Sequence, residues 1–257
     1  IAGWDQPDWQ QKTIESIKQD FANGAKALKV WKNIGMEFQD KEGNFVMIDD
    51  PKFDAIFDMV EAEDKTLTGH LGEPRDCWLP LEEMKAASNR NYFKNNPHYH
   101  MYLHPEYPSY EDHISAMKNM LRKHPNLRYV GCHFASLEWS PKELAKFLDE
   151  FPNAAVDMAA RIDDWQNVDQ TELREFILNY QDRILYGTDK GVRENNLDGF
   201  NERLLSTWKN DWKYFATDEI VPVSKSDQQV KGLNLPQDVL EKLYYKNAVK
   251  WYKWDVY

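Results

Sequence analysis

Three short apolar runs in this chain each end in a residue that could ligate a metal. His70, His133 and Asp189 stand at the ends of the runs TLTG, YVGC and ILYGT. Runs of this kind are typical of strands buried on both faces, and parallel barrels carry their chemistry at the C-terminal ends of such strands. Two imidazoles and a carboxylate gathered at one such end could bind a single divalent metal ion.

Each of these residues alone is ambiguous, because a lone His or Asp after a strand is often a hydrogen-bonded capping group. The position and the residue type agree at three strand ends, however, and the residues that follow include Gly72, Ala135 and Gly191. This agreement favours a shared metal site over three separate capping groups.

The composition sets the broad class of protein. The chain has 257 residues, of which 42% are hydrophobic, enough for a single domain over 1–257 with a sizeable core. No apolar stretch is long enough to span a membrane, so no membrane partner is expected. A net charge of −11 argues against nonspecific nucleic-acid binding, which requires clustered Lys and Arg. Two cysteines do not support a disulfide framework, and the compartment and the existence of a homo-oligomer stay open.

Helix and strand signals alternate along the chain, as in repeated βα units. Asp50-Pro51 supplies an N-cap and a first-turn proline, and Ser140 to Glu143 has the spacing of a capping box. The signals predict helices over 8–23, 51–63, 110–124, from 141 onward and over 173–181, and strands over 27–31, 66–70, 129–133, 154–159 and 184–189.

The pattern lapses over 74–109, a segment rich in Pro, Asn and aromatic residues. Segments of that length inside compact domains are usually functional lids or carry short helices. We therefore expect an insert that acts as a lid over the site or carries short helices. The aromatic residues suit a planar or sugar-like ligand, and they suit packing within the lid equally well.

Four segments together carry a family resemblance. The sequence HLGEP at 70–74, the segments 125–133 and 183–189, and the tail 235–248 resemble the amidohydrolase superfamily in its amidohydrolase-related branch. That branch also contains decarboxylases similar to aminocarboxymuconate-semialdehyde decarboxylase. The resemblance spans most of the chain and implies an α/β fold, a (β/α)8 TIM barrel. It also implies one divalent metal ion at the C-terminal mouth, zinc with manganese as the alternative.

Carried over residue by residue, the resemblance makes His70 the strand-five ligand, His133 the strand-six histidine and Asp189 the strand-eight aspartate. Asp189 and His133 are then the catalytic residues. Lys29 falls on strand four, where it is either a charge facing the substrate or a barrel lysine whose stem packs in the core.

One family feature is absent. The His-X-His pair expected at the end of strand one is not found, since the only such spacing, His98-X-His100, lies in the insert. The chain also begins at Ile1 and not at Met. We expect that it covers strands four to eight, that strands one to three are missing, and that the remaining sheet has two unpaired edges.

The activity implied by the resemblance is metal-dependent hydrolysis of a small-molecule amide, ester or lactone. Asp189 would take the proton of the attacking water and pass it to the leaving group, while His133 would orient the reacting oxygen. The alternatives are a nonoxidative decarboxylase, whose substrate carboxylate should meet an arginine, and a noncatalytic binding protein. The expected substrate contacts are Lys29, Glu73, Arg75, His104 and Arg161.

Overall fold

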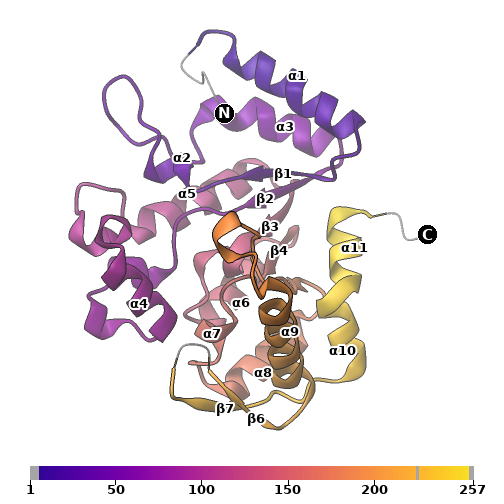
Figure 1. Cartoon of the computed structure of the whole chain (residues 1–257). Coiled ribbons are helices and arrows are strands. Elements are labelled where there is room, and N and C mark those ends of the chain that lie inside the picture. Colours follow the sequence, from indigo (N-terminus) through magenta and orange to yellow (C-terminus); the bar gives the residue numbers. More distant parts are fainter. Residues whose placement is uncertain (1–5, 224–225, 255–257) are drawn as a thin grey trace.

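The computed structural model describes residues 6–223 and 226–254, and its centre is a parallel five-stranded sheet (Figure 1). The strands follow the order β1-β2-β3-β4-β5 in space as well as in sequence. Val30 is level with Gly69, and Gly69 is level with Gly131, so the C-terminal ends of β1 to β3 form one edge. The strands are β1 (Ala27–Val30), β2 (Thr66–Gly69), β3 (Arg128–Gly131), β4 (Ala154–Asp157) and β5 (Ile184–Leu185).

Helices precede β1 and connect the successive strands, and they bury one face of this sheet, as the alternating signals predict. They are α1 (Trp9–Ala22), α3 (Asp54–Ala62), α5 (Tyr110–Lys123), α6 (Pro141–Glu150) and α8 (Gln170–Tyr180). Tyr129, Val156 and Ile184 on this face belong to the main hydrophobic core. Because side chains alternate along a strand, the neighbouring positions point to the opposite face.

Local capping explains where several helices begin. The Ser140 hydroxyl accepts from the backbone N–H of Glu143 at 3.3 Å, as the sequence predicts. Helix α8 starts three residues before the predicted position, because Asp169 caps it by accepting from the N–H of Glu172 at 2.8 Å. The predicted helix 51–63 is a short 3-10 turn (Pro51–Phe53) that continues into α3.

The C-terminal segment covers the other face of the sheet and the outer edge of β5. It consists of α10 (Gln237–Glu241), a π-helical turn (Lys242–Lys246) and α11 (Asn247–Tyr252). Tyr186 donates its backbone N–H to the carbonyl of Leu243 at 2.8 Å, and the Asn247 amide donates to the carbonyl of Ile184 at 2.8 Å. The side chain of Trp251 packs on Val130, Ala155 and Leu185.

These contacts correct the expectation of two open edges. The backbone of β5 is hydrogen-bonded on its outer side by the C-terminal segment, while β1 pairs only with β2 among the described strands. The two edges differ because the last helices fold back across the sheet.

The insert is built from short helices around a small core of its own. Its elements are η2 (Arg75–Trp78), η3 (Leu81–Glu83), α4 (Ala87–Asn95), η4 (Pro97–Tyr99) and η5 (Met101–Leu103). Cys77, Met84, Phe93 and Met101 form its core. The expectation of short helices in this segment is therefore confirmed.

The remaining elements follow the strand ends. They are α2 (Asn33–Met36), η6 (Cys132–Ser136), α7 (Ile162–Trp165), η7 (Glu194–Asn196), α9 (Phe200–Ala216) and the antiparallel pair β6 (Ile220–Pro222) and β7 (Gln229–Lys231). Within the described part of the chain, no helix is both long and apolar enough to cross a lipid bilayer.

Candidate active site

A cavity of about 1210 Å³ opens at the C-terminal edge of the sheet. Its lining comes from the ends of all five parallel strands and from α4 and α9. The chemistry-bearing residues among them include Lys29, Lys32, His70, Glu73, His133, Arg161, Asp189 and Asp211. The sheet therefore delivers polar groups from distant parts of the sequence to one place.

His70 and His133 are in direct contact within this cavity. Their ring centroids lie 4.3 Å apart with an interplanar angle of 76°, an edge-to-face arrangement. They meet because each follows one of two neighbouring strands whose last residues, Gly69 and Gly131, are level. After β3 the backbone turns through a left-handed conformation with φ of +56° at His133, and the His133 N–H donates to Asp157 Oδ1 at 3.0 Å.

Hydrogen bonds to their Nδ1 atoms fix the tautomers of both rings. Nδ1 of His133 lies 2.6 Å from the carbonyl oxygen of Ala159, which can only accept, so this nitrogen carries the proton and Nε2 keeps a lone pair. Nδ1 of His70 accepts from the indole Nε1–H of Trp31 at 3.2 Å, so His70 has the opposite tautomer. Nε2 of His70 is buried without a partner among the described groups.

Burial keeps both rings neutral. It lowers the pKa of His70 to about 2, with further lowering by the charges of His133 and Lys32. It also lowers the pKa of His133, to which the positive charge of Arg161 adds. Neutral imidazole is the form that binds a metal or accepts a proton.

Asp189 lines the same cavity as the two histidines. Among the described residues, however, no three His, Cys, Asp or Glu side chains lie close enough together to hold a metal ion. The structure thus brings His70 and His133 into contact and places Asp189 on their cavity wall. The metal triad stays a prediction.

Arg161 follows β4 and lines the cavity, and part of its guanidinium has no hydrogen-bond partner among the described residues. Its Nη1 donates to the carbonyl of Ala160 at 2.8 Å, whereas Nε is buried without a partner in the described structure. Burial would lower the pKa of Arg161, but the carboxyl groups of Asp164 and Glu138 raise it. No carboxylate of the described residues forms an ion pair with it, so the guanidinium is charged and available.

The other predicted substrate contacts divide into two groups. Lys29 and Glu73 line the cavity, and Glu73 forms an ion pair with Lys32. Arg75 and His104 lie outside it. Arg75 stacks 4.3 Å over the ring of Trp139, and the Nε2 of His104 bonds to the carbonyl of Pro97 at 3.1 Å.

The position of the insert explains this division. The cavity wall is formed by its helix α4, through side chains such as Tyr92, and the segment that carries His104 packs elsewhere. Trp31 and Lys32 also line the cavity and were not predicted as site residues, although both follow the strand that ends at Val30. Their position after the end of a strand, the signal that marked His70, could have identified them. Tyr92 belongs to the aromatic residues of the insert that were noted as suited to a planar ligand.

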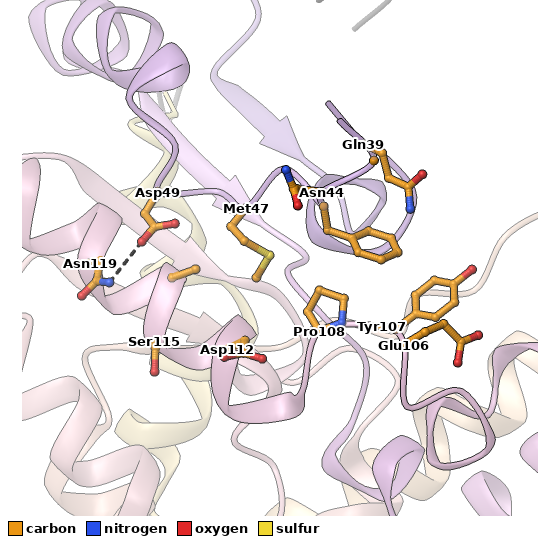
Figure 2. Close-up of a pocket in the computed structure, with 13 residues that line it drawn as sticks. Gln39, Asn44, Met47, Asp49, Glu106, Tyr107, Pro108, Asp112, Ser115 and Asn119 are labelled. Atoms are coloured by element: carbon orange, nitrogen blue, oxygen red, sulfur yellow. Dashed lines mark hydrogen bonds between the residues drawn. The ribbon is translucent and has the colours of Figure 1, made fainter. Parts of the chain in front are cut away.

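A second cavity, of about 890 Å³, lies between the loop 39–49, the end of the insert and α5 (Figure 2). Its described wall contains amide and carboxylate groups, including the Asn119 amide that donates to Asp49 at 3.0 Å. It contains no His, Cys, Lys or Arg and shares no residue with the cavity at the strand ends. The histidine and cationic side chains that line these two cavities are therefore at the strand ends.

A parallel sheet whose strands are joined by helices, with polar groups gathered at its C-terminal edge, defines an α/β protein. The chain belongs to the amidohydrolase family, whose model, described as Amidohydrolase, matches residues 6–254. This confirms the resemblance identified in the sequence. The family is metal-dependent and consists of enzymes, decarboxylases among them. No curated protein matches the chain significantly.

Solved structures share the fold. A 2,6-dihydroxybenzoate decarboxylase from Rhizobium is 17% identical, with a TM-score of 0.54 over 95% of this chain and 68% of its own. A dihydroxybenzoic acid decarboxylase from Polaromonas sp. JS666, with bound manganese and the inhibitor 2-nitroresorcinol, is 15% identical, with a TM-score of 0.53 over 95% of this chain and 66% of its own. The chain thus spans about two thirds of the length of these enzymes, and at these identities the likeness establishes the fold alone.

Proposed function

We propose that this chain supplies the active site of a metal-dependent enzyme that removes the carboxyl group of a small organic acid. The observation that carries the proposal is Arg161, which lines the cavity with His133 and has no carboxylate partner among the described residues. A buried donor left without a partner is costly, and a guanidinium pairs best with a carboxylate. A substrate carboxylate would satisfy it.

The local charge supports an anionic substrate as well. Although the chain carries a net charge of −11, the charges that act on His70 are those of Lys32, Arg161 and Lys29. Lys32 is neutralised by Glu73, while Lys29 forms no ion pair with the described residues. The two remaining cations lack a direct ion-pair partner among the described residues, although the charges of Asp164 and Glu138 also act on Arg161, and they would attract an anion to the cavity.

The types of side chain present suit a divalent metal ion, although no three of them among the described residues lie close enough together to hold one in this structure. Two neutral imidazoles offer lone pairs on His70 Nδ1 and His133 Nε2, and the Asp189 carboxylate on the same wall completes the types of donor that zinc and manganese accept. The ion would polarise a substrate oxygen and stabilise the negative charge that develops as the bond breaks.

The protein groups then have separate roles. Arg161 would bind and orient the substrate carboxylate. If His70 and Asp189 alone hold the ion, the single lone pair of His133, on Nε2, would take a proton from water or a substrate hydroxyl while Nδ1 stays bonded to Ala159. His133 would return that proton to the carbon that loses carbon dioxide. Burial of the rings would exclude bulk water from the reacting carbon.

Hydrolysis is the second candidate, and Asp189 favours it. An exposed carboxylate at the mouth of the cavity could take the proton of an attacking water, which a decarboxylase does not require. The two candidates share the same metal and differ in whether Arg161 holds the group that leaves.

The sheet is, in this proposal, strands four to eight of an eight-stranded barrel. The support is the outer edge of β1, which pairs with no described strand, and the barrel-type relatives. A structure of the protein with any preceding residues of its gene present should show a strand paired with β1. An unpaired β1 in that structure would contradict this part of the proposal.

The test compares two substrate panels on the full-length protein loaded with Mn²⁺ or Zn²⁺. Hydroxybenzoates and other small carboxylic acids should release carbon dioxide, and Arg161→Gln should raise KM by about 10- to 100-fold, the scale for a lost charged hydrogen bond. Arg161→Lys, which keeps the charge, should lose less. Turnover of amides, esters or lactones alone would select the hydrolase, and metal-loaded protein inactive on both panels would favour a noncatalytic binding protein.

A further inference from the structure

We propose that Trp31 is a reversible plug on the nitrogen of His70 that would otherwise bind the metal. The inference rests on the proposed metal-dependent function. Trp31 directly follows β1 and lines the cavity, and its indole Nε1–H donates to Nδ1 of His70 at 3.2 Å. The two rings meet edge to face with their centroids 6.5 Å apart.

The chemistry of the two rings determines which atom is blocked. An indole N–H can only donate, so Nδ1 of His70 must hold a lone pair. A neutral imidazole has one ring proton, which is therefore on Nε2. Nδ1 is thus the only nitrogen of His70 able to ligate a metal, and Trp31 already occupies it.

His133 provides the internal comparison. The partner of its Nδ1 is the backbone oxygen of Ala159, and its lone pair on Nε2 has no hydrogen-bond partner among the described residues. Of the two imidazoles, one has its lone pair free and the other has its lone pair covered by Trp31. Metal binding at both would require the indole alone to withdraw.

The surroundings of Trp31 allow that withdrawal. Half of its surface (50%) is exposed, whereas the core tryptophan Trp165 is fully buried and stacks on Phe134 at 3.7 Å. The only other ring contact of Trp31 in the described structure is with the Lys32 ammonium, 6.0 Å from its ring centroid. Rotating the indole outward would break one hydrogen bond and expose the half of the residue's surface that is now covered.

A plug of this kind competes with the metal, so removing its N–H should tighten metal binding. Trp31→Phe keeps an aromatic ring at the position and deletes the donor. The gain should be about fivefold in affinity, the equivalent of one ordinary hydrogen bond. The effect should be specific to Trp31, because no other described donor occupies Nδ1 of His70.

The experiment titrates MnCl2 into metal-free full-length protein and measures affinity by calorimetry. Four proteins are compared: wild type, Trp31→Phe, His70→Asn and Trp254→Phe. Trp254 is the matched control, since it is 53% exposed and outside the cavity. We expect Trp31→Phe to bind about fivefold more tightly than wild type, Trp254→Phe to be unchanged and His70→Asn to bind much more weakly.

A second readout follows the hydrogen bond directly. In nitrogen-15 NMR of the metal-free protein, His70 should be protonated on Nε2, and the indole resonance missing from Trp31→Phe should identify Trp31. Adding ZnCl2 should shift that indole resonance in the wild type as the bond to Nδ1 breaks.

The outcomes separate the two proposals. Equal or weaker Mn²⁺ binding by Trp31→Phe, or a His70 protonated on Nδ1 in the metal-free protein, would overturn the plug and leave the metal site standing. Binding that His70→Asn does not weaken would overturn both the metal assignment of His70 and the plug.

Discussion

The carbonyl oxygen of Ala159 accepts a hydrogen bond from Nδ1 of His133 at 2.6 Å. A loop that follows β4 therefore sets the ring of a histidine that follows β3. Asp157 strengthens this connection, because its Oδ1 accepts from the backbone N–H groups of both His133 and Ala159, each at 3.0 Å. One carboxylate thus holds both sides of the contact that orients the ring.

Removing this carboxylate should loosen the site. Asp157→Ala leaves two backbone donors without an acceptor and should lower the free energy of unfolding by about 2 kcal/mol. Asp157→Asn keeps an oxygen at Oδ1 and should cost less than half as much. Urea denaturation of the three proteins measures the difference. Equal stability of the Ala variant and the wild type would show that the turn holds without Asp157.

Gly69, the last residue of β2, is packed against an aromatic ring. A Cβ added there would lie 2.3 Å from the hydroxyl oxygen of Tyr129 and 2.7 Å from its Cε2. Gly69→Ala should therefore destabilise the fold by about 1–3 kcal/mol, the usual cost of overpacking. Because Gly69 directly precedes His70, the variant should also bind metal more weakly.

Tyr129→Phe provides the matched control for this clash. The hydroxyl of Tyr129 is buried without a partner among the described groups, so deleting it should leave stability nearly unchanged. In the double variant, deleting the Tyr129 hydroxyl should restore part of the stability lost through Gly69→Ala. The recovery should be incomplete, because the ring carbons of residue 129 still clash with the added Cβ. Thermal melts of the wild type, the two single variants and the double variant measure the coupling free energy between Gly69 and Tyr129. Strictly additive effects would contradict this packing.

Stability should depend on pH through His113, which is buried on α5 against Gly35 and Gly72. Burial lowers its pKa to about 4, against which the charge of Asp112 acts weakly. Between the ordinary histidine pKa of about 6.5 and pH 4 the unfolded chain binds this proton and the folded chain does not. The free energy of unfolding should therefore fall as the pH drops through this window.

The matched variant isolates that contribution. His113→Phe keeps a buried ring and removes the titrating group, so its stability should fall less steeply, with a difference of at most about 1.4 kcal/mol per pH unit. Urea unfolding at pH 7, 6, 5 and 4 measures both slopes. Parallel curves would mean that His113 is protonated equally in the folded and unfolded states.

The sequence predicts the elements of this fold better than its contacts. The strands ending near His70 and His133 are visible because continuous apolar runs mark strands buried on both faces. The Ser140 cap is visible because its partner is three residues away. Both signals are local, so the chain can be interpreted one segment at a time.

Contacts between distant segments have no such signal. The outer edge of β5 was expected to be open, and it is covered by Asn247, which lies 63 residues beyond its partner Ile184. Arg75 was expected at the substrate, and its stacking on Trp139 could not be predicted from the spacing of either residue. Such pairs are decided by how the loops pack, which residue type and periodicity do not encode.

Asp189 carries the last prediction, because it lines the cavity of the histidine pair and is the residue proposed to move protons at its mouth. Asp189→Asn keeps the size of the side chain but removes its negative charge and its basic oxygen. If the enzyme is a hydrolase, turnover should fall by about a hundredfold or more, the usual scale for loss of a general base. If it is a decarboxylase that relies on His133, turnover at saturating metal should fall less.

Activity must be measured with metal in excess, since a carboxylate ligand also contributes to metal affinity. Unchanged melting temperatures would exclude a folding defect, and near-normal turnover and metal affinity in this variant would leave Asp189 without a role in the reaction.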